Sequence, residues 1–171
     1  NEWQGYSEVN LYKSRSIASS TPSAVSSSVG YPGGPVSNAA VALGATHPDN
    51  PFFGSAARLR YLAADVGPRV SETESTFGRF VIGAKGSWAG WDVDTAVLAS
   101  QTEAGKSRTG YLQRDVTFAL LNPTTANVAA ARAGSPAYPA LPAGSFWRRA
   151  EDAALNSQAL YAALSPASLA D

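Results

Sequence analysis

The stretch TFGRFVIGAKGSWAGWDVDTAVLAS, residues Thr76–Ser100, decides the fold. In its first half Phe80, Ile82 and Ala84 alternate with other residues, and its second half alternates in the same way. A period of two residues is typical of a β-strand that has one apolar face. The two halves are joined by a short connection at Ser87–Gly90, so the stretch predicts an antiparallel hairpin whose apolar faces coincide.

The opposite face of this hairpin is polar, and its charged residues are Arg79, Lys85, Asp92 and Asp94. In a simple register Lys85 lies opposite Asp92, where a cross-strand pair of opposite charge contributes about 0.2–1 kcal/mol. A two-stranded hairpin with an apolar face is not stable alone in water. The stretch therefore needs further strands at its edges and a cover for its apolar face.

A third strand and several short helices are predicted outside the hairpin. Trp3–Tyr12 also alternates between an apolar and a polar face, so the strands are expected at about 3–12, 76–86 and 91–100. Ala57–Val66 has the pattern of a shorter strand. The expected helices are Tyr111–Leu121, Thr124–Arg132 and Ser157–Leu164, the last with Asn156 or Ser157 as its N-cap.

Two long segments, 13–75 and 101–171, lack the period of two and contain many turn-forming residues. A structureless stretch of such length is unusual inside a compact soluble domain. If both segments are loops on one side of a sheet, an even number of crossing strands must separate them. The two strands of the hairpin meet this condition, so we expect Ala57–Val66 to be a loop excursion or a strand extension rather than a crossing strand.

The composition of the chain excludes several classes of function. The chain has 171 residues, a formal net charge of +0 and 15% charged residues, which argues against a nucleic-acid-binding surface. It has no Cys and a single histidine, His47, which excludes thiolate chemistry and a multi-histidine metal site. Since His47 lies in a proline-rich loop, we expect it to be solvated rather than catalytic. No apolar run approaches the ~18 residues of a membrane helix.

The cover of the apolar face has two interpretations. In a soluble protein a second sheet or amphipathic helices would cover it, but the expected helices are short and rich in alanine. In a membrane barrel lipid covers it, and the spanning strands need about 9–11 residues with aromatic side chains at the interfaces. Trp3, Trp88 and Trp91 lie at or near strand ends, where such aromatic side chains would lie. The alternation alone leaves both interpretations open.

A series of short motifs between Asn50 and Asp171 points to one of them. The motifs are Asn50–Gly54, Leu59–Tyr61, Asp65–Arg69, Glu72–Ser75, Gly83–Gly86, Gly90–Asp94, Leu155–Ser157 and Leu160–Pro166. In their order and spacing they resemble the barrel of TonB-dependent receptors, the outer-membrane β-barrel transporters. The chain is similar to an internal fragment of such a barrel, without the plug domain, and Asn1–Ser16 fits as a preceding strand.

This resemblance implies a mainly β fold, an antiparallel membrane β-barrel segment whose long extracellular loops contain short helices. It implies part of a receptor in the bacterial outer membrane that actively takes up a nutrient such as a ferric siderophore or a saccharide. The implied partners are the remainder of its own barrel and plug, the TonB complex through that plug, a small-molecule ligand and the lipid bilayer, but no nucleic acid. Arg79, Lys85, Asp92 and Asp94 would then face the lumen. The alternatives are a soluble all-β or α+β binding or adhesion module, and an excised fragment without native activity.

The candidate ligand contacts are Trp147, Arg148 and Arg149, because Trp and Arg are favoured at recognition sites. The alternative is that this cluster anchors a loop. No catalytic residue, metal ligand or cofactor is predicted, and we expect the chain not to be an enzyme. It lacks a Gly-x-Ser-x-Gly elbow, and Gly30–Gly34 lacks the Lys-Ser/Thr of a phosphate loop.

Overall fold

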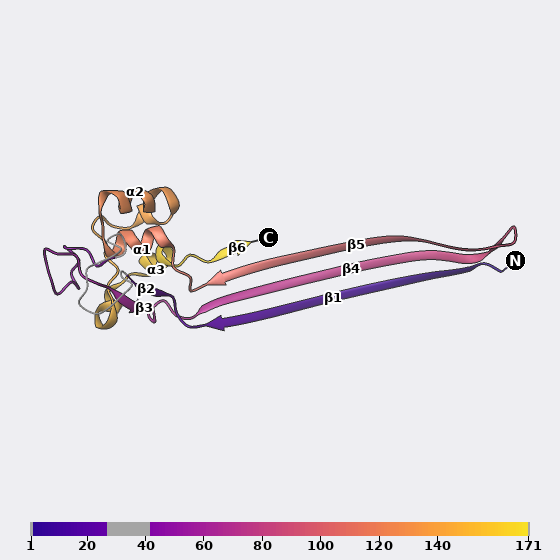
Figure 1. Cartoon of the computed structure of the whole chain (residues 1–171), viewed down its shortest axis with the longest axis horizontal. Helices are drawn as coiled ribbons and strands as arrows, with labels where there is room; N and C mark the ends of the chain where they lie inside the picture. The colour runs from indigo at the N-terminus through magenta and orange to yellow at the C-terminus, as the bar shows by residue number, and fades with distance from the viewer. Residues whose placement is uncertain (1, 27–41, 171) are drawn as a thin grey trace. The chain divides into compact units, whose positions relative to one another are not determined.

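The computed structural model describes residues 2–26 and 42–170, and this part of the chain is mainly antiparallel β-sheet with a few short helices. The main sheet has the order β1-β4-β5-β6, and its three long strands lie side by side (Figure 1). Their bounds are β1 Gln4–Ser20, β4 Arg69–Trp88, β5 Trp91–Thr109 and the short β6 Ser168–Ala170. Segment 27–41, part of the loop expected at 13–75, lies outside the described residues.

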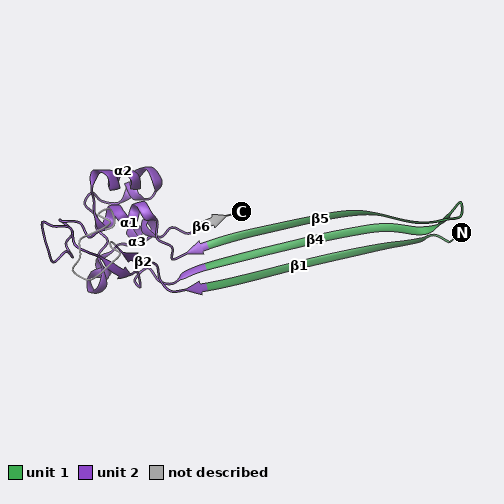
Figure 2. Cartoon of the chain, in the orientation of Figure 1, with its two compact units in different colours: residues 1–18, 71–107, 169–171 green, residues 19–70, 108–168 purple. Residues whose placement is uncertain are grey.

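The chain divides into two compact units, which Figure 2 distinguishes by colour. Unit 1 comprises residues 1–18, 71–107 and 169–171, and holds most of the long sheet. Unit 2 comprises residues 19–70 and 108–168. Both segments expected to be loops on one side of the hairpin therefore contribute to the same unit.

β1 and β4 are antiparallel neighbours, because residue numbers fall along β4 as they rise along β1. Trp3 lies against Gly86, and further along β1 the side chain of Leu11 lies against Gly78. This register places the odd-numbered residues of β1 on the same face as the even-numbered residues of β4. The alternating apolar residues of the two strands, such as Leu11 and Ile82, therefore share a face, as the alternation predicts, whereas Phe77 and Val81 lie on the opposite face.

β4 and β5 are joined by a two-residue turn. Ala89 and Gly90 both have positive φ, of 52° and 83°. Positive φ at both central residues is the signature of a type I′ turn, whose twist matches that of the strands it joins. Such a turn places Trp88 opposite Trp91.

This turn corrects the predicted pairing of Lys85 with Asp92. Asp92 instead lies opposite Ser87, whose Oγ donates a hydrogen bond to Asp92 Oδ1 at 3.0 Å. The same register places Lys85 opposite Asp94. The prediction failed because it assigned four residues to the connection, whereas Ser87 and Trp88 belong to β4.

All three long strands continue beyond their expected ends. Residues 13–20, 69–75 and 101–109 are strand, although the sequence predicted them to be loop. These extensions carry polar side chains on both faces, and the Arg15 guanidinium on β1 forms an ion pair with Glu72 on β4. Alternation signals a strand only where one face is apolar, so it could not detect these extensions.

One face of unit 1 carries an uncovered apolar band. Its residues Val9, Leu11, Phe80, Ile82 and Val97 are between 45% and 82% exposed. Three tryptophans at one end of the same face are also exposed, namely Trp3, Trp88 and Trp91. Among the described residues of unit 1, the only buried apolar side chain is Val81.

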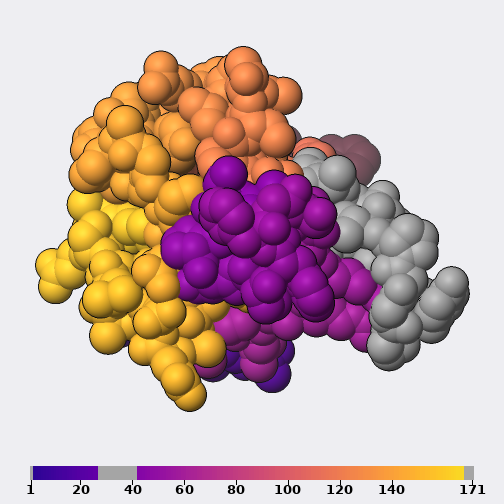
Figure 3. All heavy atoms as spheres, turned by 90° about the vertical axis from the view of Figure 1, so that its left-hand side faces the viewer, coloured from indigo at the N-terminus to yellow at the C-terminus, as the bar shows by residue number. Residues whose placement is uncertain are grey.

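Unit 2, in contrast, has a hydrophobic core of its own. A two-stranded sheet of β2 (Ala24–Ser26) and β3 (Arg60–Leu62) packs with three α-helices. The helices are α1 Arg114–Leu121, α2 Thr125–Gly134 and α3 Gln158–Leu164, with 3₁₀ turns η1 Tyr138–Ala140 and η2 Ala150–Leu155. Figure 3 shows segment 42–66, in purple, packed against the orange and yellow residues that follow α1. Ala57–Val66 contributes β3 to this sheet and no strand to the long sheet.

The helix predictions are confirmed, with shifts of one to three residues at the N-termini and an end of α2 at Gly134 rather than Arg132. Thr124 caps α2 by accepting a hydrogen bond from the backbone N–H of Asn127. Ser157, rather than Asn156, caps α3 by accepting from the N–H of Leu160. No helix in the described part of the chain is both long and apolar enough to cross a membrane.

Replacing Ala89 with Asn is expected to stabilise the hairpin, because Asn tolerates positive φ far better than Ala. We expect the free energy of unfolding to rise by about 0.5–1 kcal/mol, measured as a higher urea midpoint of the β-sheet circular dichroism signal. The matched control is Ala96→Asn in the extended strand β5, which should lower the midpoint because Asn is disfavoured in strands. A lower midpoint for Ala89→Asn would contradict the type I′ turn.

Candidate functional site

Trp147, one of the three predicted ligand contacts, is completely buried in the core of unit 2. Its indole Nε1 donates a hydrogen bond to Asp65 Oδ2 at 2.9 Å. Its ring packs edge-on against Tyr61, with the ring centroids 5.5 Å apart. In this structure Trp147 therefore presents no surface to a ligand, and its contacts are those of a loop anchor.

Asp65 joins three aromatic side chains from distant parts of unit 2. Besides the indole of Trp147, the hydroxyl of Tyr61 donates to Asp65 Oδ1 at 2.8 Å and that of Tyr161 to Oδ2 at 3.0 Å. Burial and, after it, the hydrogen bond to Asp65 raise the pKa of Tyr61 to about 12. Both tyrosines therefore remain protonated donors at neutral pH.

Arg148 and Arg149, the other two predicted contacts, are engaged by Asp49. Arg148 Nε lies 2.5 Å from Asp49 Oδ1, and its Nη2 lies 2.6 Å from Asp152 Oδ2. The backbone N–H of Arg149 donates to Asp49 Oδ2 at 3.0 Å, and its guanidinium lies 6.0 Å from the ring centroid of Tyr61. Because these charges are compensated within the unit, the geometry favours the anchoring alternative for the whole cluster.

His47 is fully buried, which corrects the expectation of a solvated side chain. Its Nδ1 accepts a hydrogen bond from the backbone N–H of Asp49 at 3.1 Å. Its Nε2 must therefore carry the proton and donate to the carbonyl oxygen of Trp147, 3.2 Å away. Burial lowers the pKa of His47 to about 4, against a smaller raising effect of Asp49, so the ring is neutral at physiological pH. The proline-rich sequence around it indicated a surface loop and concealed this packing.

The four residues predicted to face a lumen lie on one face of the long sheet. Lys85, Asp92 and Asp94 line a shallow depression of about 340 Å³ near the turn. Asp94 accepts a hydrogen bond at 3.0 Å from the hydroxyl of Tyr6 on β1. Arg79 lies on the same face, further along β4, because its number has the same parity as that of Lys85.

The Tyr6–Asp94 hydrogen bond joins β1 to β5 and passes over β4 at Gly83. A Cβ atom at position 83 would collide with the ring of Tyr6 and lie only 2.7 Å from the carbonyl oxygen of Thr95. The absence of a side chain at Gly83 therefore allows this three-strand connection.

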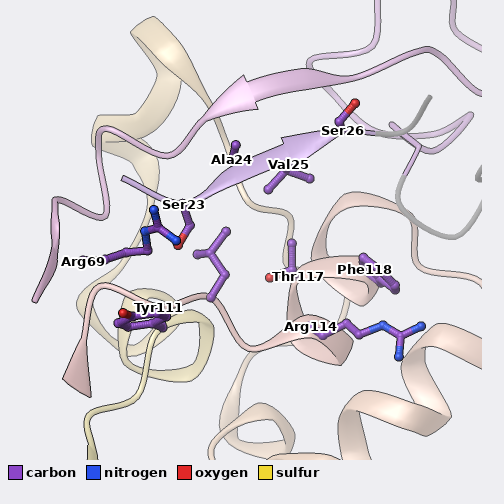
Figure 4. Close-up of a pocket in the computed structure, with 10 residues that line it drawn as sticks. Ser23, Ala24, Val25, Ser26, Arg69, Tyr111, Arg114, Thr117 and Phe118 are labelled. Carbon is purple, nitrogen blue, oxygen red and sulfur yellow. The ribbon is translucent and has the colours of Figure 1, made fainter. Parts of the chain in front are cut away.

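A pocket of about 360 Å³ in unit 2 gathers side chains that the sequence did not single out. Figure 4 shows it between β2 and the segment that leads into α1. Its lining comprises Ser23, Ala24, Val25, Ser26, Arg69, Tyr111, Leu112, Arg114, Thr117 and Phe118. Its two arginines are separated by 45 positions in the sequence (114 minus 69), so only the tertiary fold brings them together.

No protein-family model, curated protein or solved structure matches this chain. Within residues 2–26 and 42–170, no group of three or more His, Asp or Glu side chains is gathered as metal ligands would be. The function is therefore inferred from the geometry of the chain itself.

Replacing Asp65 with Ala is expected to destabilise unit 2, because it leaves three buried or half-buried donors without their acceptor. We expect a loss of about 2–4 kcal/mol in the free energy of unfolding, measured by urea titration of the helical circular dichroism signal, since the helices belong to unit 2. The control Asp152→Ala removes a half-exposed partner of Arg148 and should cost less than about 1 kcal/mol. Equal losses in the two variants would show that Asp65 has no special role.

The stability of unit 2 should fall as the pH is lowered from 6.5 to about 4. In this window the unfolded chain binds a proton at His47 that the folded chain does not, and the free energy of unfolding falls by up to about 1.4 kcal/mol per pH unit. His47→Asn removes the group that binds this proton. The free energy of unfolding of the variant should therefore change less with pH, measured by urea titrations between pH 6.5 and about 4. An identical pH dependence in the variant would assign the effect to the carboxyl groups instead.

Proposed function

We propose that this chain is part of the β-barrel wall of a TonB-dependent outer-membrane receptor, with lipid as the cover of its apolar band. The observation that carries this proposal is the exposure of Val9, Leu11, Ile82 and Val97 on one face of the sheet. Contiguous exposed apolar surface of this kind marks a partner or a membrane. The described residues of unit 1 offer no cover of their own.

The length and ends of the apolar band support lipid as that cover. Between Trp3 and Lys13, the band on β1 covers about ten residues, and transmembrane strands need about 9–11. The exposed tryptophans mark one end of the band, as aromatic residues do at a membrane interface. The ion pair of Arg15 with Glu72 lies beyond the other end, where headgroups and water would solvate it.

The opposite face of the sheet supports a polar lumen. It carries Lys85, Asp92 and Asp94, as well as the hydrogen bond from Tyr6. In a membrane barrel, lipid-facing and lumen-facing residues alternate along every strand. A sheet with one apolar and one charged face satisfies both environments.

The two edges of the described sheet support neighbouring strands as partners. β1 has no neighbour on its outer edge, and on β5 the outer edge is paired only with the three-residue β6. Unpaired backbone groups cannot persist in hydrocarbon, since each costs several kcal/mol there. In the proposal, these edges pair with the remainder of the barrel.

The resemblance supplies the rest of the proposed function. The receptor would import a scarce nutrient, such as a ferric siderophore or a saccharide, across the bacterial outer membrane. Energy would come from the TonB complex acting through a plug domain. The short turn at Ala89–Gly90 would face the periplasm, because such barrels have short turns on the periplasmic side and long loops outside.

The substitution Ile82→Arg tests this proposal, because lipid and water give opposite outcomes. Near the middle of a lipid-facing band, Arg should lower stability in lipid vesicles by about 2–4 kcal/mol, measured by urea titration of the reconstituted chain. In a soluble protein the half-exposed Ile82 would accept Arg at little cost.

The control for that test is Gln101→Arg, which lies on the same face beyond the apolar band and should change stability in vesicles only slightly. A chain that stays monodisperse without detergent and does not associate with vesicles would contradict the proposal. That outcome would favour a soluble binding or adhesion module.

A further inference from the structure

The pocket between β2 and α1 is positively charged, although the whole chain has a formal net charge of +0. Its lining contains Arg69 and Arg114 and no carboxylate. Within the described residues, neither guanidinium forms an ion pair. This distinguishes them from Arg148, which is paired with Asp49 and Asp152 in the same unit.

Each pocket arginine is held over an aromatic ring. The guanidinium of Arg69 lies 5.7 Å from the ring centroid of Tyr111, and that of Arg114 lies 5.3 Å from the centroid of Phe118. Arg69 Nε also donates to the carbonyl oxygen of Thr21 at 2.9 Å, which fixes its direction. A cation–π contact of this kind does not use the N–H donors of the guanidinium, so these can still bind a ligand.

Two of the hydroxyl groups in the lining are already committed as donors. Ser23 Oγ donates to the carbonyl oxygen of Gly110 at 3.1 Å, and Thr117 Oγ1 donates to that of Gln113 at 2.7 Å. Arg69 and Arg114 are the charged side chains of the lining, and a charged donor forms the stronger hydrogen bonds to an anion. Val25 and Leu112 also line the pocket and supply apolar surface.

We propose that this pocket binds a small organic polyanion, with one carboxylate held by Arg69, a second by Arg114 and an apolar body against Val25 and Leu112. Arg binds carboxylates through parallel N–H donors, which makes it selective for planar anions. A volume of about 360 Å³ suits a ligand of this size. Only the role of the anion as the transported ligand rests on the proposed receptor function. Binding of the anion in the pocket requires no membrane.

Isothermal titration calorimetry of the full 171-residue chain with citrate tests this inference. We expect saturable binding with a dissociation constant of about 1 mM or lower, weakened by added salt because charges carry it. Maltose, a neutral saccharide, should not bind in the pocket. Absence of saturable citrate binding, or equal binding of maltose, would overturn the inference.

Two variants locate the binding in the pocket. Arg114→Gln removes an exposed guanidinium that lies over the ring of Phe118. This variant should bind citrate about tenfold more weakly. The control Arg132→Gln makes the same charge change on the exposed surface of α2 and should leave the affinity unchanged. Arg69→Gln should also weaken binding, with the helical circular dichroism signal confirming that unit 2 remains folded.

These outcomes separate the inference from the proposed function. Loss of affinity in both Arg132→Gln and Arg114→Gln would indicate diffuse attraction of the anion and overturn the pocket. If the Ile82→Arg test supports a lipid-facing band but citrate does not bind, only the polyanion is rejected. If citrate binds with the expected variant pattern to a chain that ignores vesicles, the pocket stands and the receptor proposal fails.

Discussion

The apolar band of the long sheet is the constraint on which the interpretation of this molecule depends. A sheet face with Val9, Leu11, Ile82 and Val97 in water is unfavourable by roughly 25 cal/mol for each Å² of apolar surface left exposed. Unit 2 buries its own apolar side chains, because its helices and its small sheet share one core. Unit 1 has no such core among its described residues, and its apolar band is exposed.

The sequence predicted the central parts of the long strands correctly, but not the residues at which these strands end. Phe80 and Ile82 alternate with other residues because one face of β4 is apolar, and this physical cause is local. The ends of the strands depend instead on pairing with neighbouring strands, as for Arg15 with Glu72. The connection was predicted at Ser87–Gly90, but its two-residue length was not, because Ala rarely adopts positive φ and Ala89 therefore gave no turn signal.

The candidate site was harder to predict because its parts are distant in sequence. Trp147 and its partner Asp65 are 82 positions apart, and nothing near either residue reveals that they meet. A Trp beside two arginines fits a recognition surface equally well until burial is known. The charged pocket was missed for the same reason, since Arg69 and Arg114 acquire a common role only in the folded unit.

The absence of a side chain at Gly83 affects the register in which the three long strands pair. A slip of β1 by two residues would keep its apolar face correctly oriented and so escape the usual penalty for misalignment. In one direction, however, Glu8 would replace Tyr6 above the glycine and bring its carboxylate toward Asp94, where like charges repel. In the other direction the shorter side chain of Gln4 would have to reach across β4 to Asp94. Tyr6 therefore favours one register of β1 on β4 over the registers, shifted by two residues, that would keep the same apolar face.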